Sequence, residues 1–232
     1  MTRVADVLAW LKAEGSAETA EGNARFALPT DAYGVPVGAM RSQAKAIGTD
    51  HDLALALWDV GGARAYEPRM MAVFLADPKR LTRTEADRWT GTFDNWAICD
   101  TACFHLYDRA PFRWGVVRAW AMREEEYVRR AGFAMLWALS VHDKKAEDAC
   151  FLDRLDLVRT HADDGRTYVK KAIDMALRAI GKRNLALNGA ARTLASELAG
   201  ADAPSARWIG AHARRELTSA KVRERLEGKA RR

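Results

Sequence analysis

The sequence has few cysteines, and their arrangement limits what they can do. Cys99, Cys103 and Cys150 are an odd number in apolar helical surroundings, and there is no second pair to complete a zinc site. Cys99 and Cys103 are spaced to share a helix face close to His105, but this spacing fits core packing better than a metal site. We therefore predict reduced thiols and no metal.

Long apolar runs are also missing. No stretch approaches the roughly eighteen apolar residues that a membrane span requires. The opening segment, from Met1 to Gly15, has its apolar face interrupted by Asp6 and Lys12, so we expect a first amphipathic helix rather than a signal peptide. The sequence predicts no membrane partner and a location in the bacterial cytosol or nucleoid.

The local patterns of several enzyme classes are absent. There is no P-loop, dinucleotide-binding glycine pattern, zinc-protease helix or nucleophile elbow. No lysine stands out as a Schiff-base nucleophile, and strand-nicking lyase activity is not predicted. The five histidines are scattered without ligand spacing, at positions 51, 105, 142, 161 and 212.

What the chain does contain is an internal repeat. The segment Tyr127-Val128-Arg129-Arg130-Ala131 returns as Tyr168-Val169-Lys170-Lys171-Ala172, and the spacing, 168 − 127 = 41 residues, is in the range of two-helix HEAT or armadillo units. Tyr66-Glu67-Pro68-Arg69-Met70-Met71 resembles a third, degenerate copy. The repeat predicts equivalent helices that present a row of cations, which makes Arg130, Lys170 and Lys171 candidates for binding phosphate.

Helical periodicity extends over the rest of the chain, and no segment has the alternation typical of a strand. The predicted helices cover residues 3–14, 17–27, 36–47, 51–59, 66–76, 84–92, 95–107, 112–121, 124–140, 145–161, 166–180, 184–199, 204–216 and 218–228. Breaks are expected at positions such as Gly61-Gly62, and Thr84 and Ser205 are expected to cap helices. We predict an all-α, HEAT-like helical-repeat solenoid, with residues 1–232 as one domain and 218–232 as a basic C-terminal helix or tail.

Charge is distributed unevenly along this array. The net charge is +6, but from Gly165 to the end there are 16 lysines and arginines against 6 acidic residues, which gives +10 there and leaves −4 for the rest. Such an imbalance favours a polyanionic partner, although a solvated basic surface is the alternative. Arg178 is a further candidate cation, whereas Lys182 and Arg183 could bind phosphate or cap a helix C-terminus. Arg25 and Arg41 are candidates from the N-terminal part.

One local pattern could support chemistry. Trp96 and Asp100 lie four residues apart and should project from the same helix face. A carboxylate beside an aromatic surface can stabilise positive charge that develops at an anomeric carbon. The alternative is a buried tryptophan next to a surface aspartate, which is the commoner arrangement.

These residues carry a resemblance to a known family. Asn95-Trp96 with Asp100, followed by the two repeat copies and Ala176-Leu177-Arg178, resembles the AlkD family of bacterial DNA alkylation repair glycosylases from about Ala24 to Leu198. The resemblance implies a HEAT-like solenoid whose basic concave face holds duplex DNA. It also implies a monofunctional, cofactor-free enzyme that removes N3- and N7-alkylated purines without flipping the base.

The resemblance also assigns roles to individual residues. Trp96 corresponds to the aromatic residue that packs against the damaged nucleotide, Asp100 to the catalytic carboxylate, and Arg130 to an arginine that contacts the DNA backbone. Phe26 stands where the best-known members have a tyrosine. Met175 stands where they have a second active-site tryptophan, so part of the surface that contacts the lesion is changed.

The leading prediction is therefore a DNA glycosylase acting, as a monomer, on alkylated purines in double-stranded DNA. A second possibility is a noncatalytic relative that binds damaged, bent or branched DNA. A third is a protein-interaction scaffold, which the C-terminal excess of cations argues against.

Overall fold

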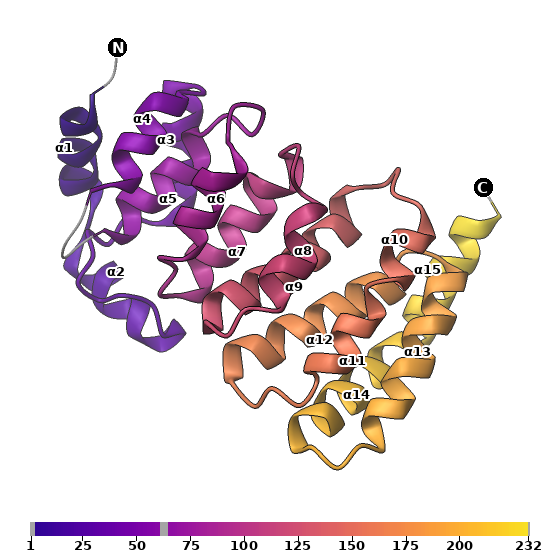
Figure 1. Ribbon diagram of the computed structural model, residues 1–232. Helices are drawn as coiled ribbons and strands as arrows, with labels where there is room; N and C mark the ends of the chain where they lie inside the picture. The colour runs from indigo at the N-terminus through magenta and orange to yellow at the C-terminus, as the bar shows by residue number, and fades with distance from the viewer. Residues whose placement is uncertain (1–2, 61–64, 232) are drawn as a thin grey trace. The chain divides into compact units, whose positions relative to one another are not determined.

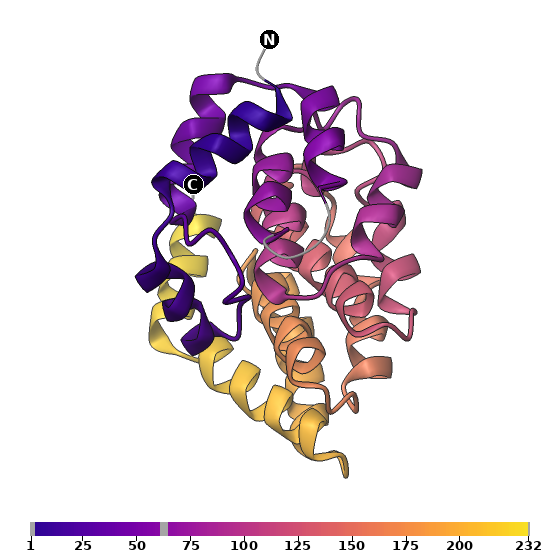
Figure 2. The ribbon, with the colours of Figure 1, turned by 90° about the vertical axis from the view of Figure 1, so that its left-hand side faces the viewer.

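The computed structural model describes residues 3–60 and 65–231, and these residues form helices and connecting loops without any strand (Figures 1 and 2). The contacts group the chain into two compact units, Met1–Arg113 and Trp114–Arg232. Each unit is described by itself below. The predicted break at Gly61-Gly62 lies outside the described residues.

The first unit is organised around helix α5, which packs against α3, α4 and α7. Its apolar side chains, among them Met70, Met71 and Leu75, are fully buried. The elements of this unit are α1 (Val4–Glu14), α2 (Ala17–Gly22), the 3-10 helix η1 (Asn23–Phe26), α3 (Val37–Ile47), α4 (His51–Trp58), α5 (Tyr66–Leu75), α6 (Arg83–Thr90), α7 (Trp96–His105) and the 3-10 helix η2 (Tyr107–Arg109).

The second unit has α12 at its centre, in contact with α9, α11, α13 and α14. Figure 1 shows α9 and α12 side by side. The elements of this unit are α8 (Gly115–Ala121), α9 (Glu126–His142), α10 (Asp148–Leu152), α11 (Leu155–His161), α12 (Thr167–Gly181), α13 (Leu185–Ala199), α14 (Pro204–Leu217) and α15 (Ala220–Ala230).

The repeat seen in the sequence corresponds to these two neighbouring helices. Tyr127 is the second residue of α9 and Tyr168 the second residue of α12, and their ring centroids lie 5.6 Å apart. The copies differ just after the shared segment, where Gly132 stands. A Cβ atom at Gly132 would lie 2.3 Å from the backbone nitrogen of Ala121, so the glycine allows α9 to pack closely on α8.

Some predicted details were wrong. Thr82, not Thr84, caps α6, because its hydroxyl accepts from the Glu85 amide while the Glu85 carboxylate accepts from the Thr82 amide. Ser205 does not cap α14 and is buried, since the helix begins at Pro204, a residue suited to the first helical position. The segment predicted as one helix over 145–161 is divided into α10 and α11.

Arg129, to which the sequence assigned no role, connects two turns of the second unit. Its guanidinium is buried and donates to the Asp164 carboxylate at 2.8 Å and to the Ala121 carbonyl at 3.2 Å. Arg166 donates to the same carboxylate at 2.6 Å. Burial alone would raise the pKa of Asp164, but the hydrogen bonds from Arg166 and Arg129 lower it to about 2.

The lowered pKa of Asp164 indicates that its ionised carboxylate stabilises the fold. Replacing Asp164 with asparagine should lower the free energy of unfolding at pH 7 by about 2 kcal/mol, because the wild-type carboxylate is bound more tightly to its arginines as an anion. The contribution is fully present above the ordinary pKa of 3.8 and is lost as the pH falls through about 2. Urea unfolding at several pH values should show the two proteins converging in acid. A difference that stays constant down to pH 2 would contradict this explanation.

Candidate nucleic-acid interface

Helix α7 positions the two residues that the sequence singled out. The Asn95 side chain accepts a hydrogen bond from the Ile98 amide at 3.0 Å and so starts the helix at Trp96. The opposite side of α7 is buried through small and apolar residues such as Ile98 and Ala102. Trp96 and Asp100 are both only partly buried, one helical turn apart, and share the outer side of α7.

Phe26 lies next to Trp96, although 70 residues separate them in the sequence. The indole nitrogen of Trp96 donates to the main-chain carbonyl of Phe26 at 2.8 Å, and the Phe26 side chain is 63% exposed. The chain leaves η1 through Ala27 in a left-handed conformation with φ 51°. Two aromatic rings and the carboxylate of Asp100 therefore belong to one surface region of the first unit.

Arg41, a candidate for binding phosphate, is already engaged within the first unit. Its Nη2 atom lies 2.6 Å from Nε2 of His105, and its guanidinium lies over the Phe74 ring at 5.6 Å from the centroid. His105 is the last residue of α7, at the opposite end of the helix from Trp96. Arg41 therefore lies beside the C-terminal end of α7, with its guanidinium in contact with His105 and Phe74.

In the second unit, the cations of α12 differ in their surroundings. Lys171 is exposed, and the Lys170 ammonium lies 5.0 Å from the centroid of Trp208, a 40% exposed ring on α14. Trp208 stacks on His212 with 5.2 Å between ring centroids. Trp208 was not predicted from the sequence, where its local signal was the spacing of four residues from His212 on a basic helix.

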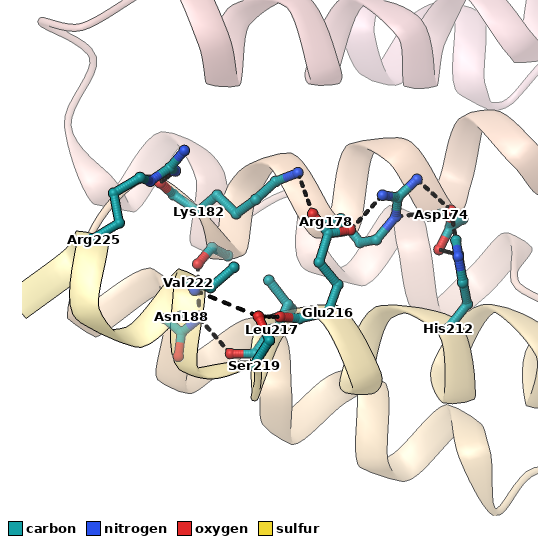
Figure 3. Close-up of polar contacts among 11 residues, drawn as sticks. Asp174, Arg178, Lys182, Asn188, His212, Glu216, Leu217, Ser219, Val222 and Arg225 are labelled. Atoms are coloured by element: carbon teal, nitrogen blue, oxygen red, sulfur yellow. Dashed lines mark hydrogen bonds and ion pairs between the residues drawn. The ribbon is translucent and has the colours of Figure 1, made fainter.

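Arg178 is held by two carboxylates (Figure 3). It donates to Asp174 at 2.9 Å within α12 and to Glu216 of α14, which also pairs with Lys182 at 2.7 Å. Burial alone would raise the pKa of Glu216, but the hydrogen bonds from Lys182 and Arg178 lower it. His212 of α14 also contacts Asp174, because its Nδ1 atom lies 2.9 Å from the Asp174 carboxylate.

The remaining predicted residues of this unit are placed as follows. Arg130 is 2% exposed and donates to the Tyr168 carbonyl at 2.6 Å, so its guanidinium joins α9 to α12. Met175 is partly buried on α12. Arg183, a candidate for phosphate binding or for helix capping, donates to the carbonyls of Ser140 at 2.9 Å, in the last turn of α9, and of Ala146 at 3.2 Å.

Within residues 3–60 and 65–231, no group of three or more His, Cys, Asp and Glu side chains is placed to hold a metal ion. Over the same residues, no helix combines the length and apolar character needed to cross a membrane.

Comparisons with known proteins agree with this picture of the fold. The family model described as DNA alkylation repair enzyme matches residues 7–191, which is most of the chain. The chain belongs to this family. None of the curated proteins with which it was compared matches it.

A solved structure supports the fold class. It is described as "a new family of proteins related to the HEAT-like repeat DNA glycosylases with affinity for branched DNA structures". The two chains superpose with a TM-score of 0.79 at 21% sequence identity, over 97% of this chain and 96% of that chain. The predicted all-α, HEAT-like repeat fold of this DNA alkylation repair family member is thereby confirmed.

Proposed function

We propose that the protein is a DNA glycosylase that removes positively charged N3- and N7-alkylated purines from duplex DNA. The observation that carries the proposal is the placement of Trp96 and Asp100 together on the outer side of α7, in a chain of the DNA alkylation repair family. Neither residue is enclosed in the core, so both are accessible to a DNA strand.

The chemistry requires little more than one carboxylate. An alkylated purine carries a formal positive charge, so when the bond between C1′ and the base nitrogen breaks, the electron pair leaves with the purine and neutralises it. No general acid is needed. Positive charge then develops on the deoxyribose, where the Asp100 carboxylate stabilises it and orients a water molecule. The water oxygen bonds to C1′ and its proton passes to solvent.

The aromatic side chains act on the same nucleotide. The Trp96 ring offers a π surface to the sugar and to the cationic base, a contact worth about 0.5 to 2 kcal/mol. Its hydrogen bond to the Phe26 carbonyl holds the indole in place, and the exposed Phe26 ring extends the apolar surface. Contacts of this kind do not require the base to leave the stack.

Cations of the second unit bind the DNA backbone in this proposal. Lys170 and Lys171 are the leading phosphate contacts, because Lys171 is exposed and the Lys170 ammonium lies over the face of an exposed ring. Arg130 and Arg178 were predicted to do the same. Both are engaged by protein groups, so we propose that they contribute mainly by holding α12 against α9 and α14.

The proposal is tested by incubating the monomeric protein with methylated duplex DNA and detecting released 7-methylguanine and 3-methyladenine by chromatography. Release that depends on the protein and leaves the strands intact until alkaline treatment supports a monofunctional glycosylase. Tight binding to the duplex without release of either base would overturn it.

The methionine at position 175 provides a prediction about rate. Met175→Trp should raise the single-turnover rate of 7-methylguanine release by about threefold to thirtyfold, since a second ring adds a cation–π contact, worth about 0.5 to 2 kcal/mol, to the positive charge that develops on the deoxyribose. Met175→Leu, which changes the shape but adds no ring, is the control and should leave the rate within about twofold. An unchanged rate in the tryptophan variant would show that position 175 does not contact the lesion.

A second candidate function is binding to branched DNA without base removal. It is favoured by the similar solved structure, whose protein is described as having affinity for branched DNA structures, and by the missing tryptophan at position 175. A comparison of affinities for a four-way junction and for a duplex of equal length tests it. Preference for the junction together with no base release would favour this candidate.

A further inference from the structure

The second unit contains a cavity of about 1150 Å³ where the C-terminal ends of α9 and α12 meet α15. Ser219 caps the start of α15 by accepting from the Val222 amide at 3.4 Å, which sets the direction of this helix (Figure 3). Five cationic side chains line the cavity: Lys144, Lys182, Arg183, Arg225 and Lys229. Trp137 forms part of the wall, and the acidic residues on it are Asp148 and Glu224.

Within the described residues, four of these cations have no carboxylate within ion-pair distance. Lys182 pairs with Glu216, but among the described residues Lys144, Arg183, Arg225 and Lys229 form no ion pair. The same is true of Glu224, and the oxygens of Asp148 accept instead from the Asn184 amide group at 2.8 and 3.0 Å. The lining therefore carries more positive charge than its own groups neutralise.

Part of the arrangement is explained by helix capping. Arg225 donates to the Lys182 carbonyl at 2.7 Å, Lys229 donates to the Arg183 carbonyl at 3.0 Å, and Arg183 binds the end of α9. Carbonyl groups carry only partial charge, so they cannot neutralise several full charges gathered in one place. The pKa of Lys144 is lowered, first by burial and then by the charges of Lys229, Arg183 and Arg225.

The positive charge also continues outside the cavity. Residues 204–232 hold nine lysines and arginines against three acidic residues. Several of them, such as Lys221, Arg223 and Arg214, are exposed on α14 and α15. A small anion would use only the cavity, whereas a long polyanion would use both the cavity and the surface around it.

We propose that this cavity, defined by Lys144, Arg183, Arg225 and Lys229, is a nucleic-acid phosphate site that takes backbone phosphates of a DNA strand. The site shares no residue with the Trp96 and Asp100 surface. The inference rests on the DNA-binding part of the proposed function and not on its glycosylase chemistry. Phosphate oxygens would provide the full negative charge that the helix carbonyls do not.

Charge reversal within the cavity tests the site. Arg225→Glu and Lys144→Glu should each weaken binding to a fluorescent duplex about tenfold and reduce the slope of log affinity against log salt by about one. Arg192→Glu is the matched control, because Arg192 is exposed on α13 of the same unit and does not line the cavity. It should change the affinity by no more than about twofold. Circular dichroism confirms that each variant is folded.

Other outcomes separate the possible ligands. If all three substitutions weaken duplex binding equally, DNA is attracted only by the overall electrostatic field of the protein. If the two cavity variants bind the duplex as tightly as wild type, the proposed phosphate site is wrong. If inorganic pyrophosphate binds the wild type but not Arg225→Glu, while duplex affinity is unchanged, the cavity serves a free phosphate compound and the proposal is wrong. Base release is measured in parallel, so a protein that binds DNA through the cavity but releases no purine would refute the glycosylase alone.

Discussion

Asp100→Asn should reduce the single-turnover rate of 7-methylguanine release by about 10²- to 10³-fold, the loss seen when one group that stabilises transition-state charge is removed. Affinity for an undamaged duplex should change by less than about threefold, because Asp100 faces the sugar and not the phosphates in the proposed complex. The measurement is base release by excess protein over a time course, with duplex affinity measured separately.

The expectation depends on charge and not on shape. Asparagine occupies nearly the same volume and can still orient a water molecule, but it is neutral when the sugar becomes cationic. In the proposed complex, the ground state carries this charge on the purine, farther from Asp100 than C1′ is. The substitution should therefore act mainly on the rate of bond cleavage and only weakly on binding.

A matched substitution separates this role from a general loss of negative charge. Asp52→Asn removes one carboxylate from the same unit, at an exposed residue that pairs with Arg80 on the surface. It should leave the release rate within about twofold of wild type, as exposed ion pairs contribute little. Wild-type release by Asp100→Asn, or equal losses in both variants, would show that Asp100 is not the stabilising group.

Much of the fold could be predicted from the sequence because helices leave local signals. The apolar period and the breaks at glycine and proline placed the helices close to their observed bounds, and the copies at Tyr127 and Tyr168 identified α9 and α12 as equivalent. The position of Trp96 at the start of α7 follows from Asn95, whose side chain is suited to capping. These features depend on residues within a few positions of one another.

The surroundings of the cations could not be predicted in the same way. Asp174 lies four residues before Arg178, so the ion pair between them could be expected from the sequence. The second partner of Arg178, Glu216, comes from a different helix. The Tyr168 carbonyl that binds Arg130 and the Trp208 ring under Lys170 are each 38 residues away in the chain. Such contacts arise only when α9, α12 and α14 pack. Tertiary packing therefore decides which cations of the repeat are bound by protein groups and which are left to contact DNA.

The same limit applies to Glu67, which the sequence showed only as part of a degenerate repeat. Its side chain is fully buried on α5, and its carboxylate accepts hydrogen bonds from three successive backbone amides. The donors are Tyr33 at 3.1 Å, Gly34 at 2.8 Å and Val35 at 3.4 Å. These amides belong to the loop that connects η1, which carries Phe26, to α3. Glu67 thus joins the centre of the first unit to the segment beside Trp96.

Glu67→Ala should lower the free energy of unfolding by about 3 to 5 kcal/mol, because it leaves buried amide groups without an acceptor and opens a cavity. Glu67→Gln keeps one acceptor oxygen and should cost less, about 1 to 3 kcal/mol. Glu21→Ala, at an exposed position of α2, should change the stability by less than about 0.5 kcal/mol. Urea unfolding followed by circular dichroism measures all three. Equal stability of Glu67→Ala and wild type would mean that the loop finds other acceptors, and the support proposed for Phe26 and Trp96 would then have to come from elsewhere in the unit.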